Sequence, residues 1–395
     1  MKETLRYARR TLRPEDRSVF ELPRPALLDR VIARAPQAGP VLLFGPPGAG
    51  KTTLLLETAR ALSARGWACI YLDLMGAASS PERFALAALD ALSAESFGAL
   101  LGRATQIRRL AEPGGDGAAS VQALLSLWSA LADAGGRPVA LLLDEPTEIR
   151  SLAYFAGLRE AASALGEALR RRPRGTLLAT SYPTQARALW PALEAMEVPP
   201  LAASELEAAL SPLGLGARTA GLLRASFGWP RYARVLVERL AQGDGLETAW
   251  AQEMAPGGRL ESAARHTYEA LLLRSRGYGM SKAVLAAVAD EEGMNLTALV
   301  ARLGRSPGAI RDYLGWLLDV DVLRSAKKRY YYVDGMVRAW VRLHGRGQPA
   351  TAAELAAAAR AAIAGELGID PAAAGAADPE EPPVPARRDH LMEID

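Results

Sequence analysis

Cysteine and histidine are both scarce in this chain of 395 residues. Its one cysteine, Cys69, has no second thiol with which to form an internal disulfide, and the sequence therefore predicts a cytoplasmic location. The three histidines, His266, His344 and His390, are far apart in sequence, and no metal-ligand spacing is present. These shortages exclude a disulfide scaffold and a zinc site of the usual spacing.

Long apolar runs and a strong charge imbalance are missing as well. No stretch approaches the roughly 20 apolar residues of a membrane-spanning helix, and no apolar signal core follows the first residues. We therefore expect neither a membrane protein nor a secretory leader. The formal net charge is only +3, so the chain is not a polycation, and any contact with nucleic acid must come from a local basic patch.

Lysine is rare in this chain, and arginine supplies most of the positive charge. The arginine surplus reflects composition, so each lysine is informative. The lysines are Lys2, Lys51, Lys282, Lys327 and Lys328. Half of the residues are hydrophobic, which is enough for a sizeable core, and the length predicts two or three domains.

From about residue 20 to 200, short apolar segments alternate with helical ones, which predicts an α/β core around a parallel sheet. Helices are expected at Thr52–Arg65, in three stretches between about 81 and 134, and at Tyr154–Arg172. Strands are expected at Val41–Phe44, Ala68–Leu74, Val139–Leu143, Thr176–Thr180 and Glu197–Leu201. We divide the chain into a basic N-terminal arm (1–20), the α/β core (21–201), a helical region (202–260), a third unit (262–345) and a partly disordered tail rich in Ala, Pro and acidic residues (346–395). Within that tail, about 351–367 can form an Ala-rich helix.

A glycine-rich segment follows the first expected strand and matches the pattern G-x-x-x-x-G-K-[ST]. Glycines let successive backbone N–H groups curl into an anion site, and the N-terminus of the next helix faces the same point. Lys51 can reach the β- and γ-phosphates, and the Thr52 hydroxyl is a suitable Mg²⁺ ligand. The segment reads Gly45, Pro46, Pro47, Gly48, Ala49, Gly50, Lys51, Thr52 and Thr53. It predicts a P-loop that binds a nucleoside triphosphate, which we take to be ATP with Mg²⁺.

Two carboxylates end the apolar strand about 90 residues further on. Asp144 is expected to hold Mg²⁺, and the adjacent Glu145 to polarise an attacking water. Most P-loop kinases lack that second carboxylate, so Glu145 favours hydrolysis over phosphotransfer. The next strand ends at Thr180 and Ser181, where a hydroxyl could sense the γ-phosphate or hold the lytic water; we favour Ser181, with Thr180 as the alternative.

At these residues the sequence resembles the AAA+ superfamily, and within it the STAND-like signalling and archaeal-type ATPases that carry a C-terminal winged helix. The resemblance covers about residues 20–345. It implies a P-loop NTPase core, a helical lid and a winged helix-turn-helix. The segment Leu22–Leu28, with Arg24, is similar to the family segment that packs near the adenine. Val198–Leu201, followed by Ser204, which can cap a helix, resembles the junction between core and lid.

The resemblance also implies lid and neighbour contacts with the nucleotide. Gly228-Trp229-Pro230-Arg231 is similar to the lid motif whose glycine and proline contact the nucleotide, and Arg231 falls where many relatives place a sensor arginine. Ring-forming relatives insert an arginine finger into a neighbouring site, which implies a homo-oligomer in the ATP-bound state. Arg187 is one candidate for the finger, and the others are Arg170, Arg171, Arg172 and Arg174. The helical region at about 75–137 has no assigned role.

The third unit reads as a helix-turn-helix followed by a hairpin, which is the pattern of a winged helix. Leu296–Leu303 and Pro307–Leu318 are the expected helices, with Ser306 as the cap of the second. The second helix of such a unit enters the major groove of DNA and the hairpin tip meets phosphates. The candidate contacts with double-stranded DNA are Arg305, Arg311, Lys327, Lys328 and Arg329. Such units also serve as protein docks.

Three functions stay open at this point. The first is an ATPase that couples nucleotide state to conformational change or assembly and contacts DNA. The second is a signalling switch that holds ADP and uses the winged helix as a protein dock. The third is an accessory ATPase that recruits a nuclease or transposase. No ABC-transporter signature and no further recombinase or helicase motif is present, and we expect no membrane partner.

Overall fold

The computed structural model describes residues 22–37, 39–92, 101–131, 133–134, 136–172, 174–345 and 347–367. The basic arm expected at 1–20 and the tail from 368 onward lie outside the described residues. The chain divides into two compact units, residues 1–250 and 251–395. None of the helices among the described residues combines the length and the apolar character needed to cross a membrane.

The first unit is built on a parallel sheet, which confirms the expected α/β class. Its strands lie in the order β2 (Ala68–Asp73), β4 (Arg137–Asp144), β5 (Thr176–Thr180), β1 (Pro40–Phe44) and β6 (Glu194–Glu197). The short β3 (Asp133–Ala134) pairs antiparallel with the start of β4. The central strands have buried, apolar middle residues, as expected where helices cover both faces of a sheet.

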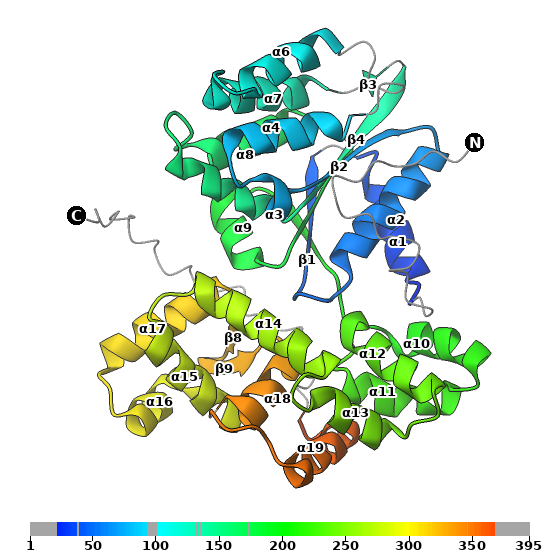
Figure 1. Ribbon diagram of the computed structural model, residues 1–395, viewed down its shortest axis with the longest axis vertical. Coiled ribbons are helices and arrows are strands. Elements are labelled where there is room, and N and C mark those ends of the chain that lie inside the picture. The colour runs from blue at the N-terminus through cyan, green and yellow to red at the C-terminus, as the bar shows by residue number, and fades with distance from the viewer. Residues whose placement is uncertain are drawn as a thin grey trace. The chain divides into compact units, whose positions relative to one another are not determined.

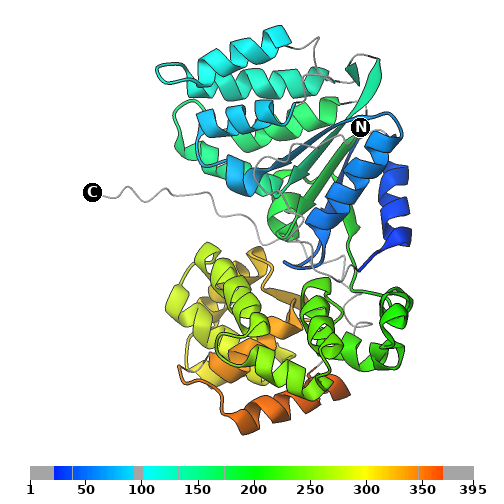
Figure 2. The ribbon, with the colours of Figure 1, turned by 45° about the vertical axis from the view of Figure 1, so that its right-hand side comes forward.

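Figures 1 and 2 show α1 (Pro25–Arg34) and α2 (Lys51–Ala64) on one face of this sheet. The other face carries α4 (Pro81–Asp90), α7 (Gly117–Ala130) and α8 (Ala161–Arg171). Short α3 (Leu74–Ala77), α6 (Leu101–Ala111) and α9 (Pro183–Leu189) complete the core. The helices α4, α6 and α7, whose role the sequence did not indicate, pack on one another and bury Phe84 edge-on against Trp128.

Two expected elements differ from the structure. The helix expected at Tyr154–Arg172 begins only at Ala161, as α8; Tyr154 instead ends a 3-10 helix, η3 (Pro146–Tyr154), and Gly157, with a positive φ of 77°, lies in the segment between them. The last strand is β6 at Glu194–Glu197 rather than Glu197–Leu201. Pro199 and Pro200 have no N–H to donate to a ladder, so the strand ends before them.

Residues 203–254 are helical, as expected. The elements are α10 (Ala203–Leu210), η4 (Ser211–Leu213), η5 (Gly216–Arg218), α11 (Thr219–Ala225), α12 (Pro230–Ala241) and α13 (Leu246–Met254). Ser204 is not the cap: it lies inside α10, and Glu205 accepts a hydrogen bond from the N–H of Ala202 at 2.9 Å. We call α10 to α12 the lid helices.

The second unit contains the expected helices and hairpin. Its elements are α14 (Arg259–Arg274), α15 (Tyr278–Asp290), β7 (Met294–Asn295), α16 (Leu296–Leu303), α17 (Pro307–Asp319), β8 (Leu323–Ala326), β9 (Arg329–Tyr332), α18 (Gly335–His344) and α19 (Ala352–Ala364). Ser306 caps α17 by accepting from the N–H of Ala309 at 3.3 Å. The strands form a small antiparallel sheet in the order β7-β9-β8.

Arg172 is part of the core rather than of the surface. Its guanidinium donates to the carbonyl oxygens of Trp128, Leu131 and Val139 at 3.0, 2.6 and 3.0 Å and to the Thr176 hydroxyl at 3.0 Å. Burial lowers the pKa of Arg172 to about 10, so the side chain remains a cation at neutral pH. It ties the end of α8 to α7 and to strands β4 and β5.

Replacing Arg172 by leucine should lower the free energy of unfolding by at least about 3 kcal/mol, because it leaves several buried acceptors without donors. Arg171→Ala is the matched control: this neighbour's side chain is 71% exposed, and we expect a change within about 0.5 kcal/mol. Urea unfolding followed by circular dichroism measures both. Equal stabilities for the two variants would contradict the structural role of Arg172.

Candidate functional site

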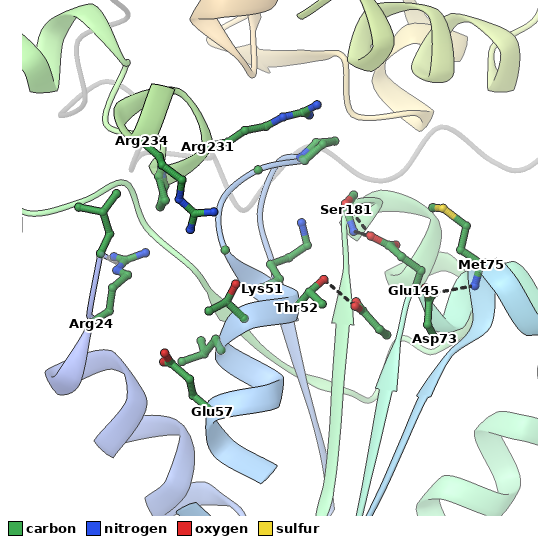
Figure 3. Close-up of a pocket in the computed structure, with 18 residues that line it drawn as sticks. Arg24, Lys51, Thr52, Glu57, Asp73, Met75, Glu145, Ser181, Arg231 and Arg234 are labelled. Atoms are coloured by element: carbon green, nitrogen blue, oxygen red, sulfur yellow. Dashed lines mark hydrogen bonds between the residues drawn. The ribbon is translucent and has the colours of Figure 1, made fainter. Parts of the chain in front are cut away.

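The carboxyl ends of β1, β2, β4 and β5 meet at one edge of the sheet, and a pocket of about 370 Å³ lies there. In a parallel sheet this edge is the usual position of a ligand site. Figure 3 shows the side chains that line the pocket, some from the strand ends and α2, others from the segment before α1 and from lid helix α12. The described lining residues are Leu22, Arg24, Pro47, Gly48, Gly50, Lys51, Thr52, Thr53, Leu54, Glu57, Asp73, Met75, Asp144, Glu145, Ser181, Pro230, Arg231 and Arg234.

The loop Gly45–Gly50 joins β1 to α2 as expected of a P-loop. Gly48 and Gly50 have φ angles of 92° and 90°, a region that side chains disfavour. Helix α2 begins at Lys51, and Gly50 offers no side chain to cap its first N–H groups. These N–H groups therefore remain available to an anion.

Lys51 is buried inside this loop. Its ammonium donates to the carbonyl oxygens of Gly45 and Pro46 at 2.8 and 2.9 Å. Burial lowers the pKa of Lys51, while the charges of Glu145 and Asp144 act in the opposite direction. A buried ammonium next to a cluster of free N–H groups favours a ligand with several negative oxygens.

Thr52 and Asp144 meet at the floor of the pocket. The Thr52 hydroxyl donates to Asp144 Oδ2 at 2.6 Å, and the Tyr71 hydroxyl donates to the same oxygen at 3.1 Å. The other oxygen, Oδ1, is buried and has no hydrogen-bond partner among the described residues. Burial raises the pKa of Asp144 to about 6, although the bond from Thr52 opposes that shift. A hydroxyl and an unpartnered carboxylate oxygen side by side fit a hard divalent cation such as Mg²⁺.

Glu145 occupies a strained position beside Asp144. Its φ of 48° is unusual for a residue with a side chain, and its N–H donates to Ala179 O at 2.7 Å. Its carboxylate accepts from Thr180 Oγ1 at 3.1 Å, from Ser181 Oγ at 2.6 Å and from the Ser181 N–H at 3.0 Å. Both hydroxyls that the sequence offered as alternatives therefore bind the same carboxylate.

The lid motif packs directly on the P-loop. The N–H of Arg231 donates to Gly48 O at 3.3 Å, and a Cβ at Gly48 would lie only 2.8 Å from the Arg231 Cβ. Pro230 lines the pocket beside Gly50. Gly228, with a φ of 71°, accepts from the N–H of Leu201 at 2.8 Å, which joins the lid motif to the end of the core.

Arg24 lines the pocket, but its guanidinium binds protein groups. It donates to the carbonyl oxygens of Pro199 and Pro200 at 2.8 and 3.2 Å and lies 3.4 Å from Glu205. The side chain therefore ties the segment before α1 to the junction with the lid. Its contact with a nucleotide remains a prediction.

The arginine-finger candidates are not among the described residues that line the pocket. Arg187 on α9 is exposed and lies over the Phe44 ring, 5.0 Å from its centroid. Arg170 and Arg171 pair with Glu167, and Arg174 pairs with Asp133. Arg172 was wrong as a candidate, because it is buried in the core.

Sequence reasoning missed several lining residues. Asp73 ends β2 opposite Asp144, and its position at a strand end could have indicated it. Glu57 lies six residues after Lys51 on α2 and belongs to no recognisable motif. Arg234 lies one turn after Arg231 on α12, a spacing that could have indicated it.

The candidate DNA contacts of the second unit lie near the start of α17 and at the hairpin tip. Arg305, Arg311, Lys327, Lys328 and Arg329 are exposed. Lys327 and Lys328 form a two-residue turn in which both have positive φ, 50° and 60°. The Arg329 guanidinium already makes a hydrogen bond within the chain, because it donates to Gly293 O at 2.7 Å.

Comparison with known proteins agrees with this geometry. Residues 25–179 match the family model of the AAA ATPase domain. No curated protein matches the chain. Among solved structures, the Walker-type ATPase of Pyrococcus abyssi is 15% identical, with 84% of this chain and 97% of that chain covered and a TM-score of 0.62.

Two further solved structures match more weakly. A STAND protein from Pyrococcus horikoshii is 13% identical, with 84% and 43% covered and a TM-score of 0.37. The Cdc6p protein of Pyrobaculum aerophilum is 14% identical, with 88% and 96% covered and a TM-score of 0.34. The P-loop geometry agrees with the family model and with the P. abyssi fold. Residues 25–179 are thus similar to the AAA ATPase domain, and the core of the chain has the P-loop NTPase fold.

Proposed function

We propose that this chain binds Mg²⁺–ATP and hydrolyses it, and that the nucleotide state changes its conformation or assembly. One observation carries the proposal. At the pocket floor the Thr52 hydroxyl meets Asp144, whose second oxygen is buried without a partner among the described residues, and Glu145 follows directly. These groups line one pocket with the buried ammonium of Lys51, which supports a cation-binding role for Thr52 and Asp144.

Different residues of the pocket bind different parts of the proposed ligand. The N–H groups of Gly48 to Thr53 and the ammonium of Lys51 hold the phosphates, which replace the loop carbonyls as partners of Lys51. Thr52 and Asp144 hold Mg²⁺, which supplies positive charge to the phosphate oxygens when it is bound. Pro230 and Arg231 bring the lid onto the loop, as their contacts with Gly50 and Gly48 suggest.

Glu145 orients the attacking water and accepts its proton. In the described geometry its carboxylate is occupied by Thr180 and Ser181. Turnover therefore requires the carboxylate to exchange at least one of these bonds for the water. Ser181, which touches Glu145, is then a positioning residue for that carboxylate.

We further propose that residues 262–345 act as a winged helix that contacts double-stranded DNA. The support is local: two exposed lysines in a chain with few lysines occupy a strained turn at the hairpin tip. Backbone of this kind normally selects Asn and Gly, so two lysines are unusual residues for this turn. A protein-docking role in an ADP-bound switch, or recruitment of a nuclease or transposase, remains the competing proposal.

The proposal also covers the oligomeric state of the chain and its location in the cell. Arg187 is exposed close to the P-loop end of β1, where a neighbouring copy could receive it as a finger in an ATP-bound homo-oligomer. We also propose a cytoplasmic location, on the strength of the single cysteine.

Glu145→Gln should retain ATP binding and lose at least about 100-fold in turnover, because the amide cannot accept a proton. Lys51→Ala should lose ATP binding itself, because the phosphates lose their buried cation. Phosphate release and titration calorimetry separate the two effects. Wild-type turnover by Glu145→Gln would refute the assignment of the base.

Replacing Lys327, Lys328 and Arg329 by alanine should weaken binding to duplex DNA. The logarithm of the DNA-binding constant should then fall less steeply with the logarithm of the salt concentration, with a slope smaller in magnitude by about 2 to 3. The matched control removes three exposed arginines of α6, Arg103, Arg108 and Arg109, and should leave the slope unchanged. Fluorescence anisotropy between roughly 50 and 200 mM salt provides the measurement. If both triple variants bind DNA like the wild type, the hairpin does not contact DNA.

A further inference from the structure

Tyr71 on strand β2 donates a hydrogen bond to Asp144, the carboxylate proposed to hold the cation. The Tyr71 side chain is buried, and its hydroxyl lies 3.1 Å from Asp144 Oδ2. The Thr52 hydroxyl donates to the same oxygen at 2.6 Å. Tyr71 is not among the described residues that line the pocket. Its hydroxyl therefore acts on the carboxylate from within the protein rather than from the space that a ligand would fill.

The pairing of β2 with β4 explains why this hydroxyl reaches Asp144. Tyr71 pairs with Leu142, two residues before Asp144 on the neighbouring strand. Alternate residues of a strand project to the same face of a sheet, so Tyr71 and Asp144 share a face. Helix α2 covers that face, because Cys69, two residues before Tyr71, donates its thiol to Ala59 O at 3.4 Å. The carboxylate therefore receives one donor from α2 and one from the neighbouring strand.

The two oxygens of Asp144 have unequal partners. Oδ2 accepts both hydroxyls, whereas Oδ1 is buried and has no hydrogen-bond partner among the described residues. The Thr52 hydroxyl has a single proton, which it donates to Oδ2, so its oxygen lone pairs remain for a cation. Two donors on one carboxylate oxygen thus leave the other oxygen as the acceptor that a cation can use.

A single donor would not hold this carboxylate in one orientation. The last torsion of an aspartate side chain joins an sp³ to an sp² carbon, and its energy wells are broad. With Thr52 alone, the carboxylate plane could turn about that bond, and the Tyr71 hydroxyl restrains it. Carboxylates that bind metals are usually held by such outer partners, and the loss of one commonly costs about 10- to 100-fold in metal affinity or activity.

We propose that Tyr71 is a positioning residue that fixes the Asp144 carboxylate for the divalent cation of the bound nucleotide. The inference rests on the proposed Mg²⁺–ATP site and adds a residue that acts on the cation only through Asp144. Loss of the hydroxyl therefore weakens the magnesium-dependent part of nucleotide binding. It leaves the part that depends on Lys51 and the loop N–H groups.

The test is Tyr71→Phe, which removes the hydroxyl and keeps the ring. Titration calorimetry measures the affinity for a non-hydrolysable ATP analogue at several magnesium concentrations and in a chelator. The variant should need about tenfold more magnesium for the same affinity, and high magnesium should restore wild-type binding by mass action. In the chelator its affinity should stay within about twofold of the wild type, because the phosphate contacts are independent of Tyr71.

Tyr332→Phe is the matched control, because it makes the same change at a buried tyrosine that is not among the described lining residues. The Tyr332 hydroxyl donates to Leu285 O at 2.7 Å in the second unit. The melting temperature of this variant should fall, because a buried hydrogen bond is lost. Its magnesium dependence should match that of the wild type.

The inference is overturned if Tyr71→Phe shows the magnesium dependence of the wild type. It is also overturned if the variant loses the same factor of affinity with magnesium and in the chelator, because the hydroxyl then supports the pocket as a whole. In either case, loss of binding in Lys51→Ala would still uphold the proposed nucleotide site. A wild-type chain whose affinity does not respond to magnesium would instead remove the proposed cation site, and this inference with it.

Discussion

The buried ammonium of Lys51 is the constraint on which the site depends. A cation in an apolar interior requires acceptors and counter-charges, and the sheet provides both at one edge. Because β1, β4 and β5 are parallel neighbours, the loop carbonyls, the Asp144 carboxylate and the Glu145 carboxylate end at the same place. The P-loop is thus the cationic part of a charge cluster that a bound phosphate chain would complete.

Two buried polar atoms beside the pocket have no hydrogen-bond partner among the described residues. Asp144 Oδ1 belongs to the end of strand β4, and Arg234 Nε belongs to helix α12. A fold tolerates such groups at functional sites, where a ligand supplies the partner. Asp144 is acidic and Arg234 is basic. These signs are complementary to a metal cation and to a phosphate chain, respectively. By contrast, the carboxylate of Glu145 is already hydrogen-bonded to Thr180 and Ser181, so the proposed base would have to exchange one of these bonds to act.

The sequence predicted the parts of the site that follow from local patterns. The P-loop and the apolar strand ending in Asp144 and Glu145 each lie within a few residues, and parallel pairing brings them together. It failed where the outcome depends on side-chain direction. It named Arg231 but not Arg234, although both line the pocket from one face of α12. Arg172 resembles Arg170 and Arg171 in sequence, but distant carbonyls at Trp128, Leu131 and Val139 make it a core residue.

The central claim is that the edge formed by Thr52 and Asp144 binds a nucleotide together with a divalent cation. The most direct measurement is the affinity for an ATP analogue with magnesium and with a chelator, in the wild type and in Asp144→Asn. Asparagine retains an oxygen for the Thr52 hydroxyl but lacks the negative charge that the cation needs. The account predicts that magnesium tightens binding in the wild type and has little effect in the variant. An equal magnesium effect in both proteins would contradict it.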